Sequence, residues 1–188
     1  DGTLDTTFNS TGKVTTSFPG NSANAAKVLV QGDGKIVAAG WVHNGTDNDF
    51  ALVRYNSDGT LDTSFNTTGR VLTNLGDNDV IQSMAFQSNG KIVVAGFTTT
   101  GGSPHSALAR FNSDGTLDTT FNTTGIVIAS LLSPLDVLSS VAIQPDGKIV
   151  AAGYAINNGL DFDMLVVRYH GDVATGTPGT PDLSFASV

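Results

Sequence analysis

The sequence predicts an all-β chain built from three tandem four-stranded antiparallel units, and three observations support this prediction. The phrase DGTLDT(S/T)FN occurs at residues 1–9, 58–66 and 114–122, so the chain repeats itself at spacings of 57 and 56 residues. Each copy holds four short apolar runs, and none of these runs has the 3.6-residue period of a helix. Threonine, valine, asparagine and glycine are abundant, which favours strands joined by tight turns.

The first copy shows how each unit is built. Its four runs lie at residues 13–18, 26–31, 35–42 and 50–56. The second and third runs are joined by GDG, and the later copies have SNG or PDG there, a hairpin signal that needs positive φ. Loops rich in Gly, Asn and Asp join the third run to the fourth, and the tight turn NSDG follows. Each copy is therefore expected to form one antiparallel meander.

A tandem meander of this length is typical of a β-propeller blade, and a β-solenoid, whose turns are usually shorter, is the alternative. The runs at 28–30, 84–86 and 141–143 are apolar without alternation, which indicates strands covered on both faces. We therefore predict a β-propeller-like repeat domain over residues 1–172 that forms an incomplete ring. Its expected parts are an outer strand at 1–18, blades at about 19–75, 76–132 and 133–172, and then a linker with a C-terminal strand at 173–188.

The phrases DGTLDTSFNTTGRV, QPDGKIVAAG and FALVRYN resemble the bacterial delta-sixty repeat family, and the resemblance covers about residues 1–172. It implies a propeller-like fold in secreted or surface proteins of environmental bacteria, many of them exported by the type IX route. It supplies no catalytic residues. No signal peptide is visible at Asp1, so it has been removed or was never present. From the resemblance, the expected location is extracellular or the bacterial cell surface, after removal of a signal peptide.

Composition argues against several functions. The net charge of −8 disfavours a nucleic-acid backbone or an anionic lipid surface, and no apolar run approaches the ~18 residues of a membrane span. The chain has no cysteine, which excludes disulfides and thiolate metal sites. Catalytic motifs are absent, and the three histidines occupy unrelated repeat positions. We therefore expect no enzyme, no nucleic-acid partner and no membrane insertion.

Residues that recur in all three copies are expected to serve the fold. We expect the recurring arginines to be tied to an aspartate or to a backbone carbonyl, with Asp62 and Asp118 as candidate partners. The recurring glycines each precede an aromatic residue. We expect no cofactor; calcium is the alternative, because its oxygen cage needs several carboxylates together. The recurring residues are Arg54, Arg110, Arg168, Gly40, Gly96, Gly153, Trp41, Phe97 and Tyr154, and the candidate calcium ligands are Asp47, Asp49, Asp161 and Asp163.

The strand count predicts a function. Residues 1–18 form a surplus outer strand, and the third blade lacks one, so we expect the strand to pair with the third blade of another copy. The expected function is an extracellular structural subunit that assembles head to tail with copies of itself by strand exchange. The alternative is a binding module in which two chains close a six-bladed ring around a glycan or surface ligand. The expected interface residues are Val14, Phe18, Phe8, Met164, Val166 and Arg168.

Overall fold

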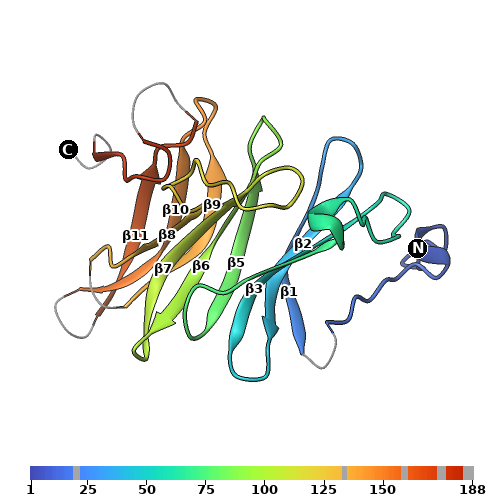
Figure 1. Ribbon diagram of the computed structural model, residues 1–188, viewed down its shortest axis with the longest axis horizontal. Coiled ribbons are helices and arrows are strands. Elements are labelled where there is room, and N and C mark those ends of the chain that lie inside the picture. The colour runs from blue at the N-terminus through green and yellow to red at the C-terminus, as the bar shows by residue number, and fades with distance from the viewer. Residues whose placement is uncertain (19–21, 133–134, 158–160, 173–176, 184–188) are drawn as a thin grey trace.

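The computed structural model describes residues 1–18, 22–132, 135–157, 161–172 and 177–183 (Figure 1). These residues form strands and two short 3-10 turns, and no α-helix is present among them. The 3-10 turns are η1 (Phe8–Ser10) and η2 (Phe65–Thr67). The strands are β1 (Ala23–Val30), β2 (Ile36–His43), β3 (Asn48–Tyr55), β4 (Arg70–Thr73), β5 (Asp79–Phe86), β6 (Ile92–Thr100), β7 (Ser103–Phe111), β8 (Ile126–Ala129), β9 (Asp136–Ile143), β10 (Ile149–Asn157) and β11 (Asp161–Tyr169).

The strands form three antiparallel sheets in which consecutive strands are neighbours. The first sheet has the order β1-β2-β3-β4, the second β5-β6-β7-β8, and the third, within the described ranges, β9-β10-β11. The sheets stand side by side, with the first residues of the chain at one end and β11 at the other (Figure 1). The all-β, propeller-like prediction is confirmed. None of the described segments is a helix of the length and apolarity needed to cross a membrane.

The Gln-x-x-Gly phrase forms the hairpin between the first two strands of each sheet. In the first sheet, Gly34 N donates a hydrogen bond to Gln31 O at 2.9 Å, and Gly34 has a φ of 85°. Only glycine adopts this conformation without strain, so the phrase requires it here. Lys35 N donates to Asp33 Oδ1 at 3.0 Å, which closes the turn from the other side.

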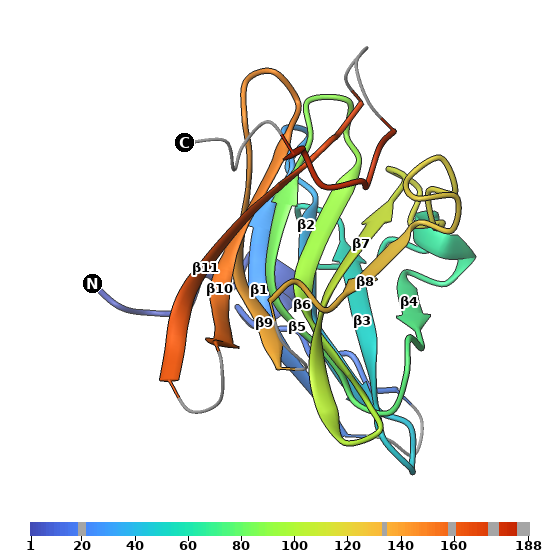
Figure 2. The ribbon, with the colours of Figure 1, turned by 90° about the vertical axis from the view of Figure 1, so that its left-hand side faces the viewer.

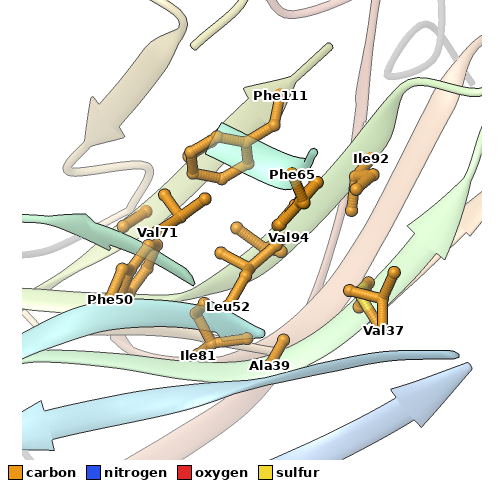
Figure 3. Packing of buried hydrophobic residues seen from close by; sticks show 13 residues of the cluster. Val37, Ala39, Phe50, Leu52, Phe65, Val71, Ile81, Ile92, Val94 and Phe111 are labelled. Atoms are coloured by element: carbon orange, nitrogen blue, oxygen red, sulfur yellow. The ribbon is translucent and has the colours of Figure 1, made fainter. Parts of the chain in front are cut away.

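Two buried apolar clusters hold the sheets against one another. The first lies between the first and second sheets, where Leu52 meets Ile81 (Figure 3). The second lies between the second and third sheets, where Leu108 meets Leu138. Each such side chain contributes about 1.5–3 kcal/mol when fully buried. We call the side of a sheet that carries Leu52 or Leu108 its forward face, because it turns toward the next sheet, and the opposite side its backward face.

Among the described residues, no sheet packs on the backward face of the first sheet. Val28 and Val30 of β1 are 59% and 64% exposed, whereas Met84, at the repeat position of Val28, is 2% exposed. The prediction that residues 28–30 are covered on both faces is therefore wrong for the first sheet. The cause is the missing neighbour, since the same position is buried where a sheet does pack against it.

Residues 13–17 form no strand within the single chain. Val14 and Phe18 instead place their side chains on the backward face of the first sheet, beside Val42 and Tyr55. Thr16 Oγ1 lies 2.7 Å from the hydroxyl oxygen of Tyr55, which is a hydrogen bond. Val14, Thr16 and Phe18 thus place their side chains against the first sheet, and Phe18 also forms an isolated β-bridge. Its expected pairing with another copy stays a prediction.

Candidate functional site

A charged cluster ties the first sheet to the second. Asp62 Oδ2 lies 2.7 Å from Arg54 Nε and 2.8 Å from Lys35 Nζ. The Arg54 guanidinium carbon lies 4.5 Å from the centre of the Phe65 ring, within the range of a cation–π contact. Arg54 Nη1 also donates to the carbonyl oxygen of Ser113 in the second sheet's NSDG turn. The recurring arginine therefore satisfies its own sheet's aspartate and reaches the neighbouring sheet.

The second sheet repeats this cluster with a deeper arginine. Arg110 has a fully buried side chain, and its Nε lies 2.7 Å from Asp118 Oδ2. Lys91 Nζ lies 2.9 Å from the same oxygen, and the Phe121 ring centre lies 4.7 Å from the guanidinium carbon. Here the contact with the neighbouring sheet comes from Asp172, whose Oδ1 lies 3.0 Å from Arg110 Nη1. A charge therefore replaces the carbonyl found in the first cluster.

These contacts change the acidity of the two aspartates. Burial alone would raise the pKa of Asp118, but hydrogen bonds from Thr120 and Lys91 and the charge of Arg110 outweigh it and lower the pKa to about 2. Burial likewise opposes the shift at Asp62, where hydrogen bonds from its lysine, serine and arginine partners hold the pKa well below its usual range. Both groups are charged in the folded chain at pH values where they would be half protonated after unfolding.

We expect the free energy of unfolding to fall as the pH drops from about 4 to about 2. The folded pKa of Asp118 lies below the unfolded value of 3.8, so its contribution is present above pH 3.8 and is lost as protons bind. The expected loss from Asp118 over this range is about 2 kcal/mol. Asp79 acts in the opposite direction, because burial raises its pKa. Denaturant unfolding at several pH values measures the slope, and a free energy that stays constant over this range would contradict the prediction.

The third sheet has the same kind of charged cluster, and its aspartate is Asp182, which lies beyond the end of β11 in the chain. Arg168 Nε and Nη2 each lie 2.9 Å from Asp182 Oδ2, and Lys148 Nζ lies 3.5 Å from it. Tyr169 pairs with Pro181 in an antiparallel bridge, just as Tyr55 pairs with Leu61 in the first sheet. Residues 178–182 thus occupy the place that residues 58–62 occupy in the first sheet. Residues 173–176 and 184–188, where we expect the linker and the last strand, lie outside the described ranges.

This fourth copy of the phrase was missed by the sequence analysis. Residues 178–185 read PGTPDLSF, against DGTLDTSF at 58–65, and share the glycine, threonine, aspartate, serine and phenylalanine. Proline replaces two residues of the phrase, and seven residues at 171–177 stand where the first copy has only Ser57. These changes give the segment the composition of a linker. Aligning G-T-x-D-x-S-F alone would have found it. The segment at 178–182 belongs to the third sheet.

The forward face of the third sheet is exposed to solvent. Figure 2 shows the molecule from this end, with β11 toward the viewer. Met164 is 94% exposed, whereas Phe50 and Ser106, at the same ladder position, are 0% and 1% exposed. Val166 is 51% exposed, whereas Leu52 at its position is completely buried. The face carries apolar side chains at positions that are buried in the other two sheets, and no described sheet packs against it.

The recurring aromatics belong to the forward faces as well. Trp41 and Phe97 are half-buried, and Tyr154 is 39% exposed on the open face. The Tyr154 and Phe162 rings meet edge to face with centroids 5.3 Å apart. Beside Asp163 and Met164 they line an open hollow of about 500 Å³. The glycines that precede the aromatics each face a β-bulge of the neighbouring inner strand.

The six expected interface residues lie at opposite ends of the molecule. On the backward face of the first sheet, Val14 and Phe18 border a groove of about 350 Å³ that runs along β2 and β3. Asn9 N donates to the Asp58 carbonyl at 2.7 Å and keeps the preceding residues beside the turn. The first end carries Phe8, Val14 and Phe18, and the third sheet carries Met164, Val166 and Arg168.

The candidate calcium ligands form two separate pairs. The Asn44 side-chain amide donates to Asp47 Oδ1 at 2.6 Å and to Asp49 Oδ2 at 3.1 Å, so a hydrogen-bond donor lies between those carboxylates. Asp161 and Asp163 are exposed on β11. Within the described ranges, no three acidic, histidine or cysteine side chains gather closely enough to hold a metal ion.

One family model matches the chain three times. It describes a β-propeller domain of unknown function, DUF5122, and matches residues 31–65, 87–121 and 144–172, just over half of the chain. The first two matches run from the hairpin glutamine to the phenylalanine beneath the arginine, so each spans one charged cluster. The third stops at residue 172, before the fourth copy of the phrase. The sequence has no match among the curated proteins.

Proposed function

The chain belongs to the β-propeller family DUF5122, and from that premise we propose that it is an extracellular structural subunit whose blades stack head to tail with those of further copies by strand exchange. The three sheets are then three blades. The phrases DGTLDTSFN and QPDGKIVAAG support the narrower assignment to the bacterial delta-sixty repeats, and with it a secreted or surface location.

The observation that carries the proposal is the contrast between equivalent positions on the forward faces. Met164 is 94% exposed in the third blade, and its counterparts Phe50 and Ser106 are buried by the blade that follows. An apolar side chain held on a flat sheet and left in water is unfavourable, and a covering blade removes that cost. The third blade is therefore built to receive another blade on this face.

A second copy offers the matching surface. The backward faces of the second and third blades are the partners that cover a forward face inside the chain. The first blade presents the same kind of face, and its Val28 and Val30 are exposed. Contact between the third blade of one copy and the first blade of the next is heterologous, so it closes into a ring or continues as a filament. Two copies would supply six blades, within the usual range for a closed propeller.

The recurring polar residues support a structural role. Arg54 and Arg110 are held by ion pairs, stacked on phenylalanine and directed at the neighbouring blade. Their charges are neutralised by aspartates with lowered pKa values, which suits a fixed tie between blades. The proposal therefore involves no reaction and no cofactor, and copies of the chain are the partners.

Replacing Met164 by aspartate is expected to abolish or strongly weaken self-association. The substitution places a charge at the centre of the proposed contact, where it would have to be buried without a partner. Light scattering coupled to size exclusion measures the mass of the wild-type chain and the variant over a range of concentrations. Ile128→Asp is the matched control, because Ile128 is 45% exposed on the outer strand of the second blade and lies outside the contact.

The masses measured by light scattering distinguish a filament from a closed ring and from a monomer. A series of large species that Met164→Asp removes and Ile128→Asp leaves intact is the expected result for a filament. A discrete dimer would indicate the six-bladed ring, the arrangement in which a central ligand such as a glycan could bind. A wild-type chain that stays monomeric at every concentration would contradict the proposed function.

A further inference from the structure

The outer edge of β11 is the edge at which each of the other two blades carries a fourth strand. In the first blade, β4 pairs with β3 so that Val71 lies opposite Leu52, and in the second blade Val127 lies opposite Leu108. The corresponding residue of β11 is Val166, and among the described residues no strand pairs with that edge. Its exposed N–H and C=O groups form a template for one more strand.

Residues 13–16 carry the repeat's outer-strand sequence. GKVTTSF at 12–18 aligns with GRVLTNL at 69–75, which puts Val14 at the position of Val71. In the single chain these residues have no ladder partner, and Val14 lies over the backward face of the first blade. Val71 has the same relation to the second blade, whose backward face it helps to cover. The segment therefore already sits where the outer strand of a preceding blade would lie.

Resting on the proposed function, we infer that the β11 edge accepts residues 13–16 of a second copy, with Val14 opposite Val166. In the same exchange, residues 1–5 of the second copy compete with residues 178–182 of the first copy for the groove beside Arg168 and Lys148. The pairing of Val14 with Val166 fixes the register of the exchanged strand. Residues 178–182 then regulate the exchange, because they must leave the groove before residues 1–5 can enter it.

The competition follows from the repeat phrase. In the first blade one continuous segment supplies both Asp62, which holds the arginine and lysine, and the outer strand that begins eight residues later at Arg70. Asp5 stands eight residues before Lys13, so a segment that docks its strand brings Asp5 to the arginine. That place is filled by Asp182 in the single chain. One oxygen position between an arginine Nε and a lysine Nζ admits one carboxylate.

The charged contacts of residues 178–182 are looser than those of the repeat phrase in the first blade, whereas the backbone hydrogen bonds are equivalent. The distance from Lys148 Nζ to Asp182 is 3.5 Å, against 2.8 Å for Lys35 and Asp62. The Arg168 side chain is 17% exposed, against 8% for Arg54.

The turn itself also differs. Asp58 accepts hydrogen bonds from the backbone and hydroxyl of Thr60, and Asp1 accepts the same two bonds from Thr3. Pro178 has no such acceptor, and the backbone N and hydroxyl of Thr180 donate instead to the Thr177 carbonyl oxygen, at 3.1 and 2.7 Å. The Asp5 carboxylate, in contrast, is exposed and accepts hydrogen bonds from the backbone and hydroxyl of its neighbour Thr7. Residues 1–5 therefore carry the same aspartate–threonine turn as the first blade and an exposed carboxylate that can exchange, and residues 178–182 act as a displaceable placeholder.

Paired cysteines test the register, because the chain has none of its own. A disulfide needs Cα atoms roughly 4.4–6.8 Å apart, which directly opposed antiparallel residues satisfy. Val14→Cys with Val166→Cys is expected to give a ladder of covalent oligomers on mild oxidation. Thr15→Cys with Val166→Cys is the control, because adjacent strand residues point to opposite faces. Equal linking in both, or none in either while non-covalent oligomers persist, overturns the register and leaves the proposed function standing; monomers throughout overturn both.

A labelled peptide of residues 1–18 tests the competition on the immobilised full-length chain. Asp182→Ala in the chain is expected to tighten binding on the order of tenfold, because the placeholder loses its charged contact. Asp5→Ala in the peptide is expected to weaken binding by a similar factor, and this variant leaves the fold of the chain untouched. Unchanged affinity for the Asp5→Ala peptide shows that residues 1–5 do not enter the groove and overturns the competition.

Discussion

Replacing Gly96 by alanine is expected to lower the free energy of unfolding by about 3 kcal/mol, near the top of the usual range for overpacking. A Cβ atom at Gly96 would overlap the carbonyl oxygen of Val80 on β5. Backbone held in a ladder cannot move aside as a flexible side chain can. The ladder shifts register between Ile81 and Ser83, and this bulge is what brings the carbonyl over the glycine.

Gly32→Ala is the matched control for this substitution. A Cβ at Gly32 would meet nothing within 4 Å, and its φ lies outside the left-handed region. The other two copies carry Ser88 and Pro145 at this position, so the repeat itself tolerates side chains there. Thermal melts followed by circular dichroism compare the two variants. Equal melting temperatures would show that the close approach at Gly96 imposes no constraint.

Asp118→Asn is expected to cost about 3 kcal/mol, because it removes a charge from a buried pair and keeps the size of the side chain. Arg110 is completely buried, so its charge cannot return to water when the carboxylate is lost. Asp172 remains 3.0 Å from Arg110 Nη1, which places the expected loss at the lower end for a broken buried pair.

Asp5→Asn isolates the effect of the buried partner. Asp5 has the same place in the repeat phrase as Asp118 but is exposed, so its replacement is expected to leave the unfolding free energy of the monomer unchanged. Denaturant titrations of the two variants at neutral pH give the comparison. A loss at Asp118 no larger than at Asp5 would mean that the cluster adds nothing to stability.

Much of the fold could be predicted because short stretches of each repeat specify their own turns and strands. Gln31–Gly34 specify a hairpin by turn chemistry alone, and the spacing of Arg54 and Asp62 puts opposite charges on neighbouring segments. The exposure of individual side chains could not be predicted, because it depends on whether another sheet packs on a given face. The run DFDMLVVRY at 161–169 does not reveal that Met164 is exposed and Leu165 buried, because that depends on a sheet covering one face only. The contact of Asp172 with Arg110 likewise could not be predicted, because Asp172 belongs to an insertion that has no counterpart in the other copies of the repeat.

The stacking of sheets also sets the order in which the molecule can come apart. Each sheet is a local meander, and the buried clusters join only adjacent sheets, so stability is approximately a sum of the sheets' own terms and two interface terms. The second sheet benefits from both interfaces, and the outer two from one each. Partial opening therefore begins with an outer sheet and leaves the β5–β8 amides as the slowest to exchange with solvent. An added copy at either end would turn an outer sheet into an inner one, so growth of the array would itself slow the fraying of its members.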